Sequence, residues 1–228
     1  MHIGILITGH APDALQPRYG DYDAFFARLL KDRGLTFSAW NVVDGQFPSD
    51  TASADGWLLT GSRYGAYEDL PWIAPLEDFI RDCFQARRRM VGICFGHQII
   101  AQALGGRVEK FPGGWAVGLT DYDWNGTPLR LNAWHQDQVT GLPDGARVLA
   151  NTDFCRYAAL AYGDQAFTVQ PHPEYDVTSF AELVEVRGPG LIPEAILDTA
   201  RAALGMADDN DILAAKIAAF FHEGTTDG

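Results

Sequence analysis

A cysteine framed by glycines is the feature of this sequence that most clearly predicts chemistry. Cys94 stands in the run Gly92-Ile93-Cys94-Phe95-Gly96, between an apolar segment and a segment of helical character. A thiol attacks a carbonyl well only as a thiolate, and a helix N-terminus favours that anion. The glycines permit the tight turn that exposes a nucleophile between a strand and a helix. We therefore expect Cys94 to be a nucleophile, with the backbone N–H of Phe95 able to bind an oxyanion.

A structural role is the alternative for any free cysteine, because cysteine is among the most buried residue types. We assign that role to Cys83 and Cys155, which lie in apolar segments without flanking glycines. A core cysteine does not need the backbone freedom that Gly92 and Gly96 provide. The glycine frame therefore favours the catalytic interpretation for Cys94.

A histidine and a carboxylate two residues apart could serve this thiol. His172 and Glu174 lie in Gln170-Pro171-His172-Pro173-Glu174, after an apolar run typical of a strand. The two prolines favour an extended backbone, in which residues i and i+2 point to the same side. Glu174 would then orient the imidazole of His172, which acts as the base. Taken alone, the same residues would also fit a proline-rich surface turn.

A second histidine competes for the role of base. His135 lies in Trp134-His135-Gln136-Asp137, which we interpret as a polar loop flanked by aromatic residues. We expect it to line a substrate pocket. His97 follows Cys94 on the predicted helix, and we expect it to pack behind the site.

Together these motifs resemble the class I glutamine amidotransferase family, in its Cys-His-Glu triad type. The resemblance rests on Gly92-x-Cys94-x-Gly96-x-Gln98, on His172-x-Glu174 and on the strand and glycine turn Leu58-Leu59-Thr60-Gly61-Ser62. It implies cleavage of a γ-glutamyl amide through a γ-glutamyl thioester. It also implies a second oxyanion donor at Gly61 or Ser62. Gln98 and the Trp134–Asp137 segment, including His135 and Asp137, would line the substrate pocket.

Finer details are similar to stand-alone members of that family, akin to the amidotransferase domain of GMP synthetase and to plant γ-glutamyl peptidases. These details are the Gly61–Tyr67 segment, Pro71-Trp72-Ile73 and the Cys94–Gln98 run. No synthetase domain is expected after Glu174, which favours a hydrolase acting alone. The alternatives are a glutaminase subunit that delivers ammonia to a separate synthetase, and a non-catalytic regulatory module. The aromatic loop Arg63–Trp72 could accommodate a leaving group or simply cover the core.

Composition narrows the partners of this 228-residue chain. The formal net charge of −13 argues against nonspecific binding to nucleic acid or to anionic membranes, because both need basic patches. Three cysteines without close spacing indicate free thiols, as in the cytoplasm. The opening Met1–Ile7 segment is typical of a buried strand rather than of a signal peptide. We expect no metal and no cofactor, since no ligand cluster or phosphate-binding loop is present.

The alternation of strand-like and helix-like segments predicts an α/β fold: an open, mostly parallel twisted sheet flanked by helices. The first half gives strands at Ile3–Ile7, Phe37–Val43 and Trp57–Thr60 and helices at Tyr22–Lys31 and Ile73–Arg88. Short alternating segments predict hairpins added to the central sheet, at Arg107–Phe111, Ala116–Asp123, Leu129–Ala133, Arg147–Asn151, Arg156–Tyr162 and Ala166–Gln170. We expect one domain over residues 1–228, with a helical C-terminal appendage at about 176–228 that contains Thr178–Val186, Pro193–Leu204 and Asp211–Phe221.

Overall fold

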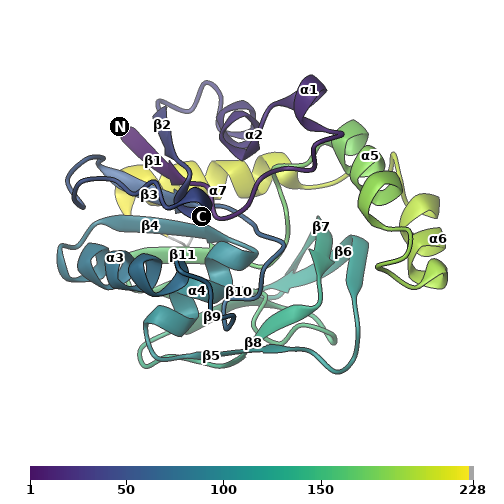
Figure 1. The fold of residues 1–228 in the computed structure, drawn as a ribbon. Helices are drawn as coiled ribbons and strands as arrows, with labels where there is room; N and C mark the ends of the chain where they lie inside the picture. The colour runs from purple at the N-terminus through teal and green to yellow at the C-terminus, as the bar shows by residue number, and fades with distance from the viewer. Residues whose placement is uncertain (226–228) are drawn as a thin grey trace.

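A nine-stranded sheet organises the molecule, in the order β2-β1-β3-β4-β11-β10-β9-β6-β7 (Figure 1). The structure is a computed structural model and describes residues 1–225. The strands are β1 (His2–Leu6), β2 (Thr36–Trp40), β3 (Gly56–Leu59), β4 (Arg89–Ile93), β5 (Arg107–Lys110), β6 (Ala116–Trp124), β7 (Thr127–His135), β8 (Asp137–Gly141), β9 (Arg147–Asn151), β10 (Ala159–Tyr162) and β11 (Ala166–Val169). The helices are α1 (Gln16–Tyr19), α2 (Tyr22–Leu29), α3 (Ile73–Gln85), α4 (Phe95–Ala103), α5 (Val177–Arg187), α6 (Glu194–Ala202) and α7 (Asn210–Glu223), with a 3₁₀ turn η1 at Val42–Asp44.

The first five strands of that order run parallel, and the other four continue the sheet in antiparallel fashion. This confirms the predicted α/β class. The parallel strands are buried on both faces, as their nearly continuous apolar runs require. Residues alternate between the two faces, so that Leu58 belongs to one core while Trp57 and Leu59 belong to the other.

Helices cover both faces of the parallel strands (Figure 1). Apolar residues of α2 and α7 form one core with the sheet, and those of α3 and α4 form the other. The C-terminal helices belong to this packing, because Ile217 and Phe220 of α7 are fully buried. Gly118 of β6 lies so close to α6 that a Cβ there would stand 2.9 Å from the Cβ of Ala200.

Three expectations about the elements differ from the structure. Strands β5 and β8 pair only with each other, in a separate two-stranded sheet, instead of extending the central one. The expected strand Phe37–Val43 ends at Trp40, and a 3₁₀ turn follows. The loop expected at Trp134–Asp137 is a corner between two strands, with Gln136 alone between β7 and β8. Short strands at such corners lack a periodic signal long enough to be recognised.

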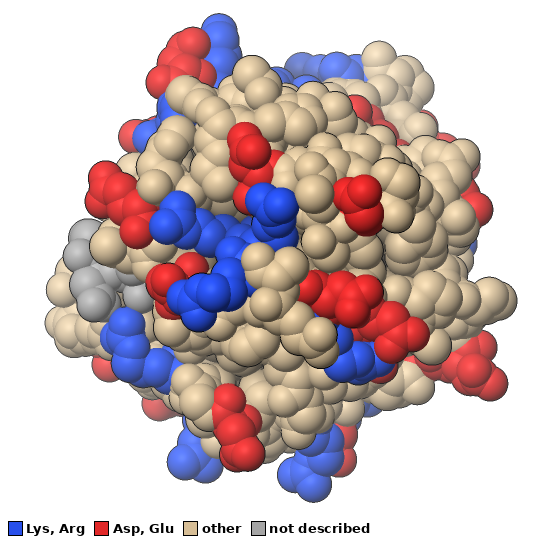
Figure 2. All heavy atoms as spheres, turned by 90° about the vertical axis from the view of Figure 1, so that its left-hand side faces the viewer, with Lys and Arg blue, Asp and Glu red and all other residues tan. Residues whose placement is uncertain are grey.

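The face at the N-terminal ends of the parallel strands carries mixed charge. Figure 2 shows Lys and Arg side chains interspersed with Asp and Glu there. The net charge of −13 is therefore not gathered as one acidic patch on this face. In residues 1–225, no helix has the length and apolarity needed to cross a bilayer.

Candidate active site

Three chain segments meet where the central parallel strands end. Strand β4 lies between β3 and β11, and the register pairs Leu59 with Gly92 and Val169 with Ile93. The segments that follow these strands therefore leave the same edge of the sheet. They carry Gly61, Cys94 and His172, and ligands of open α/β sheets bind at this edge.

Cys94 adopts a strained backbone between β4 and α4. Its φ is 52° and its ψ is −102°, which non-glycine residues rarely adopt. The flanking glycines serve a different purpose, which is close approach of backbone segments. A Cβ on Gly92 would lie 2.4 Å from the carbonyl oxygen of Gly96, and one on Gly96 would lie 2.3 Å from that of Leu59. The turn therefore needs both glycines, while the strain falls on the cysteine itself.

His172 and Glu174 form a buried pair. The imidazole Nδ1 lies 2.7 Å from Oε1 of Glu174, so that Nδ1–H donates to the carboxylate and Nε2 is left for other chemistry. The backbone N–H of His172 donates to the carbonyl oxygen of Asn132 at 2.9 Å, and the ring packs against Tyr175. Burial alone would lower the pKa of His172, but Glu174 and the nearby Cys94 outweigh it and hold that pKa well above its usual value.

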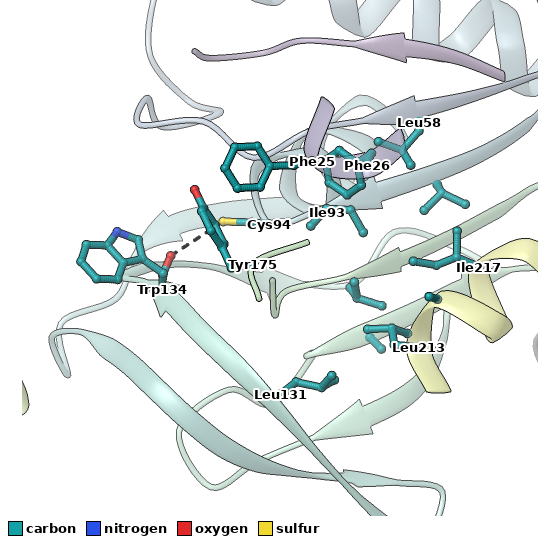
Figure 3. Packing of buried hydrophobic residues seen from close by; sticks show 14 of the residues in the cluster. Phe25, Phe26, Leu58, Ile93, Cys94, Leu131, Trp134, Tyr175, Leu213 and Ile217 are labelled. Atoms are coloured by element: carbon teal, nitrogen blue, oxygen red, sulfur yellow. Dashed lines mark hydrogen bonds between the residues drawn. The ribbon is translucent and has the colours of Figure 1, made fainter. Parts of the chain in front are cut away.

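Gly61 lies against both the thiol and the imidazole. A Cβ built on it would stand 3.1 Å from Cε1 of His172 and 3.7 Å from the Cβ of Cys94. Nε2 of His172 is buried and makes no hydrogen bond. The thiol has one long contact, 4.0 Å from Sγ to the carbonyl oxygen of Trp134, which Figure 3 shows beside Tyr175. Catalytic hydrogen bonds are often loose before substrate binds, so this arrangement suits proton transfer between Cys94 and His172.

The expected oxyanion donors flank the sulfur. Phe95 is the first residue of α4, where backbone N–H groups have no acceptor within the helix. On the other side, the Gly61–Ser62 turn is held by a buried threonine pair at the ends of β1 and β3. The Thr8 hydroxyl donates to the carbonyl oxygens of Thr60 at 2.9 Å and of Gly61 at 3.1 Å. This geometry can present two N–H groups to a carbonyl held over Cys94.

The residues expected to contact substrate form a buried network instead of an open wall. The Gln98 side chain donates to the backbone carbonyl of Asp137 at 2.9 Å and to the Gln170 side chain at 3.1 Å. His135 Nδ1 lies 3.3 Å from the same Asp137 carbonyl. Gln98 and His135 thus hold the corner between β7 and β8. Asp137 is the member of the set whose carboxylate is partly exposed, and it accepts a hydrogen bond from the Tyr67 hydroxyl at 3.1 Å.

Burial distinguishes the remaining histidines from His172. It lowers the pKa of His135 to about 3, with the charge of His172 as a second cause. Burial likewise lowers the pKa of His97 to about 3, and His97 Nδ1 lies 2.8 Å from the Thr168 hydroxyl. Both rings are neutral at pH 7 and lack a carboxylate partner among the described residues. Cys83 and Cys155 are fully buried, as predicted for core residues.

Two contributors were missed by the sequence analysis. Thr8 braces the Gly61 turn, and its signal was a small polar residue directly after the apolar β1 strand. Tyr175 packs on His172, and its hydroxyl lies 2.8 Å from that of Tyr22. The position of Tyr175 next to Glu174 offered no periodicity that would have marked it.

The fold and this site define a class of α/β proteins that comparison with known proteins identifies. A model of the family "Glutamine amidotransferase class-I" matches residues 23–186. Gamma-glutamyl peptidase 3 of Arabidopsis thaliana is 30% identical over 224 residues, covering 90% of both chains. The amidotransferase-type relative from Halobacterium salinarum, one of the subunits of its glutamine-hydrolyzing GMP synthase, is 32% identical over 180 residues, covering 73% of this chain and 90% of that protein.

A solved structure shares the fold. The crystal structure of a glutamine amido transferase from Methylobacillus flagellatus superimposes with a TM-score of 0.78 at 21% identity, covering 97% of this chain and 94% of the other. The chain belongs to the class I glutamine amidotransferase family. The predicted resemblance is thereby confirmed.

Proposed function

We propose that this protein hydrolyses γ-glutamyl amides with Cys94 as nucleophile, His172 as base and acid, and Glu174 as the residue that orients the imidazole. The substrate is glutamine or a γ-glutamyl peptide. The observation that carries the proposal is the position of Gly61, whose Cβ would lie 3.1 Å from the His172 ring and 3.7 Å from Cys94. A nucleophile, a base and an oxyanion turn are thus together at one edge of the sheet.

The reaction would proceed in two halves. The Cys94 sulfur attacks the γ-carbonyl carbon, and the oxyanion accepts hydrogen bonds from the Phe95 N–H and the Gly61–Ser62 turn. His172 holds the thiol proton and transfers it to the leaving nitrogen as the C–N bond breaks. A water molecule then gives a proton to His172, attacks the thioester, and releases glutamate and the Cys94 thiol. Ammonia leaves from glutamine, and an amine leaves from a peptide.

Recognition of the γ-glutamyl group would fall to the corner held by Gln98 and His135. The partly exposed Asp137 carboxylate is the natural acceptor for the substrate α-ammonium group, because opposite charges attract strongly where water is partly excluded. Burial raises the pKa of Asp137, and the hydrogen bond from Tyr67 opposes that rise. An ammonium group binding there would favour the ionised carboxylate.

A second candidate function is that of a glutaminase that hands ammonia to a separate synthetase. The specific support is the similarity to the GMP synthase subunit from Halobacterium salinarum, which covers 90% of that relative. A stand-alone peptidase is favoured by the match to gamma-glutamyl peptidase 3 along 90% of both chains.

Release of glutamate from glutamine and from γ-glutamyl dipeptides tests the proposal. We expect turnover by the wild type and none by Cys94→Ala, with an unchanged circular dichroism spectrum. Preference for peptides would support the peptidase, and rapid ammonia release from glutamine alone would support the partner of a synthetase. Wild-type activity in Cys94→Ala would refute the assignment.

Gly61→Ala probes the convergence on which the assignment depends. The new methyl group would press on His172, and a misplacement of even 1 Å in an active site can cost about a hundredfold in rate. We expect kcat to fall by at least about tenfold. Gly141→Ala is the matched control, because its Cβ would meet Arg107 at a similar 3.2 Å far along the chain from the site. Equal losses in both variants would show a general packing effect.

A further inference from the structure

A pocket with a volume of about 420 Å³ lies beside the proposed active site. Its walls come from the segments after β1, β2 and β3 and from the end of α5. They include His10, Asp13, Val43, Arg63, Tyr64 and Arg187. The first three of those segments leave the same sheet edge as Cys94, and the volume falls within the range of small-ligand sites.

Two contacts connect the pocket to the catalytic residues. Arg63 and Tyr64 directly follow the Gly61–Ser62 turn, and Tyr64 donates its backbone N–H to the Ser62 hydroxyl at 3.2 Å. Arg187 acts electrostatically on Tyr175, the residue that packs on His172. The pocket therefore borders the site on the side of β3 and α5.

Both arginines lack a carboxylate partner among residues 1–225. Arg63 donates to the Tyr64 hydroxyl at 2.8 Å and lies over its ring. Half-buried Arg187 makes neither a hydrogen bond nor an ion pair with any described residue. An arginine whose fork of donors stays open is suited to bind a carboxylate.

The other charged groups at the pocket are already engaged or exposed. His10 lies between two carboxylates, 2.5 Å from Asp21 and 3.1 Å from Asp44. Asp21 also caps α2 and accepts the backbone N–H of Ala11 at 2.8 Å. Asp13 is an exposed carboxylate at the pocket. The open donors are thus those of Arg63 and Arg187.

The spacing of the sheet sets how far a ligand must reach. Neighbouring strands lie about 4.8 Å apart, so the segments after β3 and β1 stand roughly 5 and 10 Å from the segment after β4. A leaving group of two amino acids extends about 7 Å from the scissile bond. Its terminal carboxylate would reach the pocket while the γ-carbonyl rests on Cys94.

We propose that this pocket binds the C-terminal carboxylate of the leaving group through Arg63 and Arg187, and that the preferred substrates are γ-glutamyl peptides with a free C-terminus. This inference rests on the proposed function. Glutamine has no group that would occupy the pocket, because its leaving group is ammonia. Charge at the pocket should therefore select among peptides without affecting glutamine.

The test compares γ-glutamyl-alanyl-glycine with its C-terminal amide, using glutamine as the internal reference. In the wild type, kcat/KM should be about tenfold to a hundredfold higher for the free acid, as expected for a hydrogen bond to a charged group. Arg187→Gln and Arg63→Gln should bring the ratio towards one and leave glutamine hydrolysis unchanged. Arg156→Gln, which alters another exposed arginine, should keep the wild-type ratio.

Binding to the Cys94→Ala variant separates the two proposals. We expect calorimetry to show tighter binding of the acid than of the amide, with the difference lost in Cys94→Ala/Arg187→Gln. If the wild type cleaves both peptides equally and the arginine variants do not change the ratio, the pocket assignment is wrong and the proposed function stands. Equal loss of glutamine and peptide hydrolysis in Arg187→Gln would also overturn it. If the wild type cleaves no γ-glutamyl compound, the proposed function fails, whatever the calorimetry shows.

Discussion

The Cys94 backbone holds conformational energy where the reaction is proposed to occur. A non-glycine residue in a sparsely populated region costs about 1–3 kcal/mol, and such residues cluster at functional sites. At φ 52° and ψ −102°, Cys94 keeps this conformation because hydrogen bonds on both sides determine it. Its N–H donates to the Val169 carbonyl at 2.8 Å, and the N–H of Gly96 donates to the Thr60 carbonyl at 3.0 Å.

The strain predicts an unusual order of stability for two inactive variants. Cys94→Gly should unfold with a free energy about 1 kcal/mol larger than Cys94→Ala, because relief of strain exceeds the extra chain entropy of glycine of about 0.5–1 kcal/mol. Urea unfolding measures the difference. In the control, Ala103→Gly in the neighbouring helix should lower stability. An alanine variant as stable as the glycine one would show that the site is unstrained.

At the scale of elements, the site depends on how the segments after β1 and β3 are joined. Thr8 and Thr60 are both fully buried, and their hydroxyl and backbone groups form several hydrogen bonds. Because one of the acceptors is the Gly61 carbonyl, the oxyanion turn is positioned from the first strand of the chain as well as from its own. A change at β1 should therefore alter catalysis.

Thr8→Val tests this coupling with a side chain of nearly the same shape. It leaves the carbonyls of Thr60 and Gly61 without their donor, which should lower the unfolding free energy by about 1–3 kcal/mol. We also expect kcat to fall, while KM changes little, because the turn is proposed to act on the oxyanion. Thr199→Val, at an exposed position, is the matched control. Loss of stability with unchanged kcat would contradict the coupling.

At the scale of the whole molecule, buried histidines link stability to pH. His97 and His135 have pKa values of about 3 because burial disfavours their charged forms, whereas an unfolded histidine titrates near about 6.5. Between these values the unfolded chain binds more protons, so stability falls as the pH falls. His172 has the opposite sign: its raised pKa contributes stability below about 6.5 that is lost as pH rises through the folded value.

His97→Asn should make stability less sensitive to acid. One such histidine contributes up to about 1.4 kcal/mol per pH unit to the slope of the unfolding free energy. Asparagine can still bond to Thr168, so the variant should fold but show a smaller slope between pH 4 and 6, measured by urea unfolding. His222→Asn, at an exposed position, should keep the wild-type slope. An unchanged slope in His97→Asn would mean that His97 is already protonated in the native state.

The predicted elements succeeded where periodicity is long and failed where geometry is local. The strands Arg147–Asn151 and Ala166–Val169 lie where alternation predicted strands. The pairing of β5 with β8 was missed because it joins segments 31–34 residues apart, a choice that no local pattern encodes.

The sequence by itself determined the family, the α/β class and the candidate nucleophile, because glycines around a cysteine and prolines around a histidine restrict the backbone locally. Only the tertiary structure decided that Gln98 and His135 form a buried support. It also decided that two distant arginines, Arg63 and Arg187, line one pocket. These outcomes depend on the order of strands in the sheet, which brings together segments that local rules treat as independent.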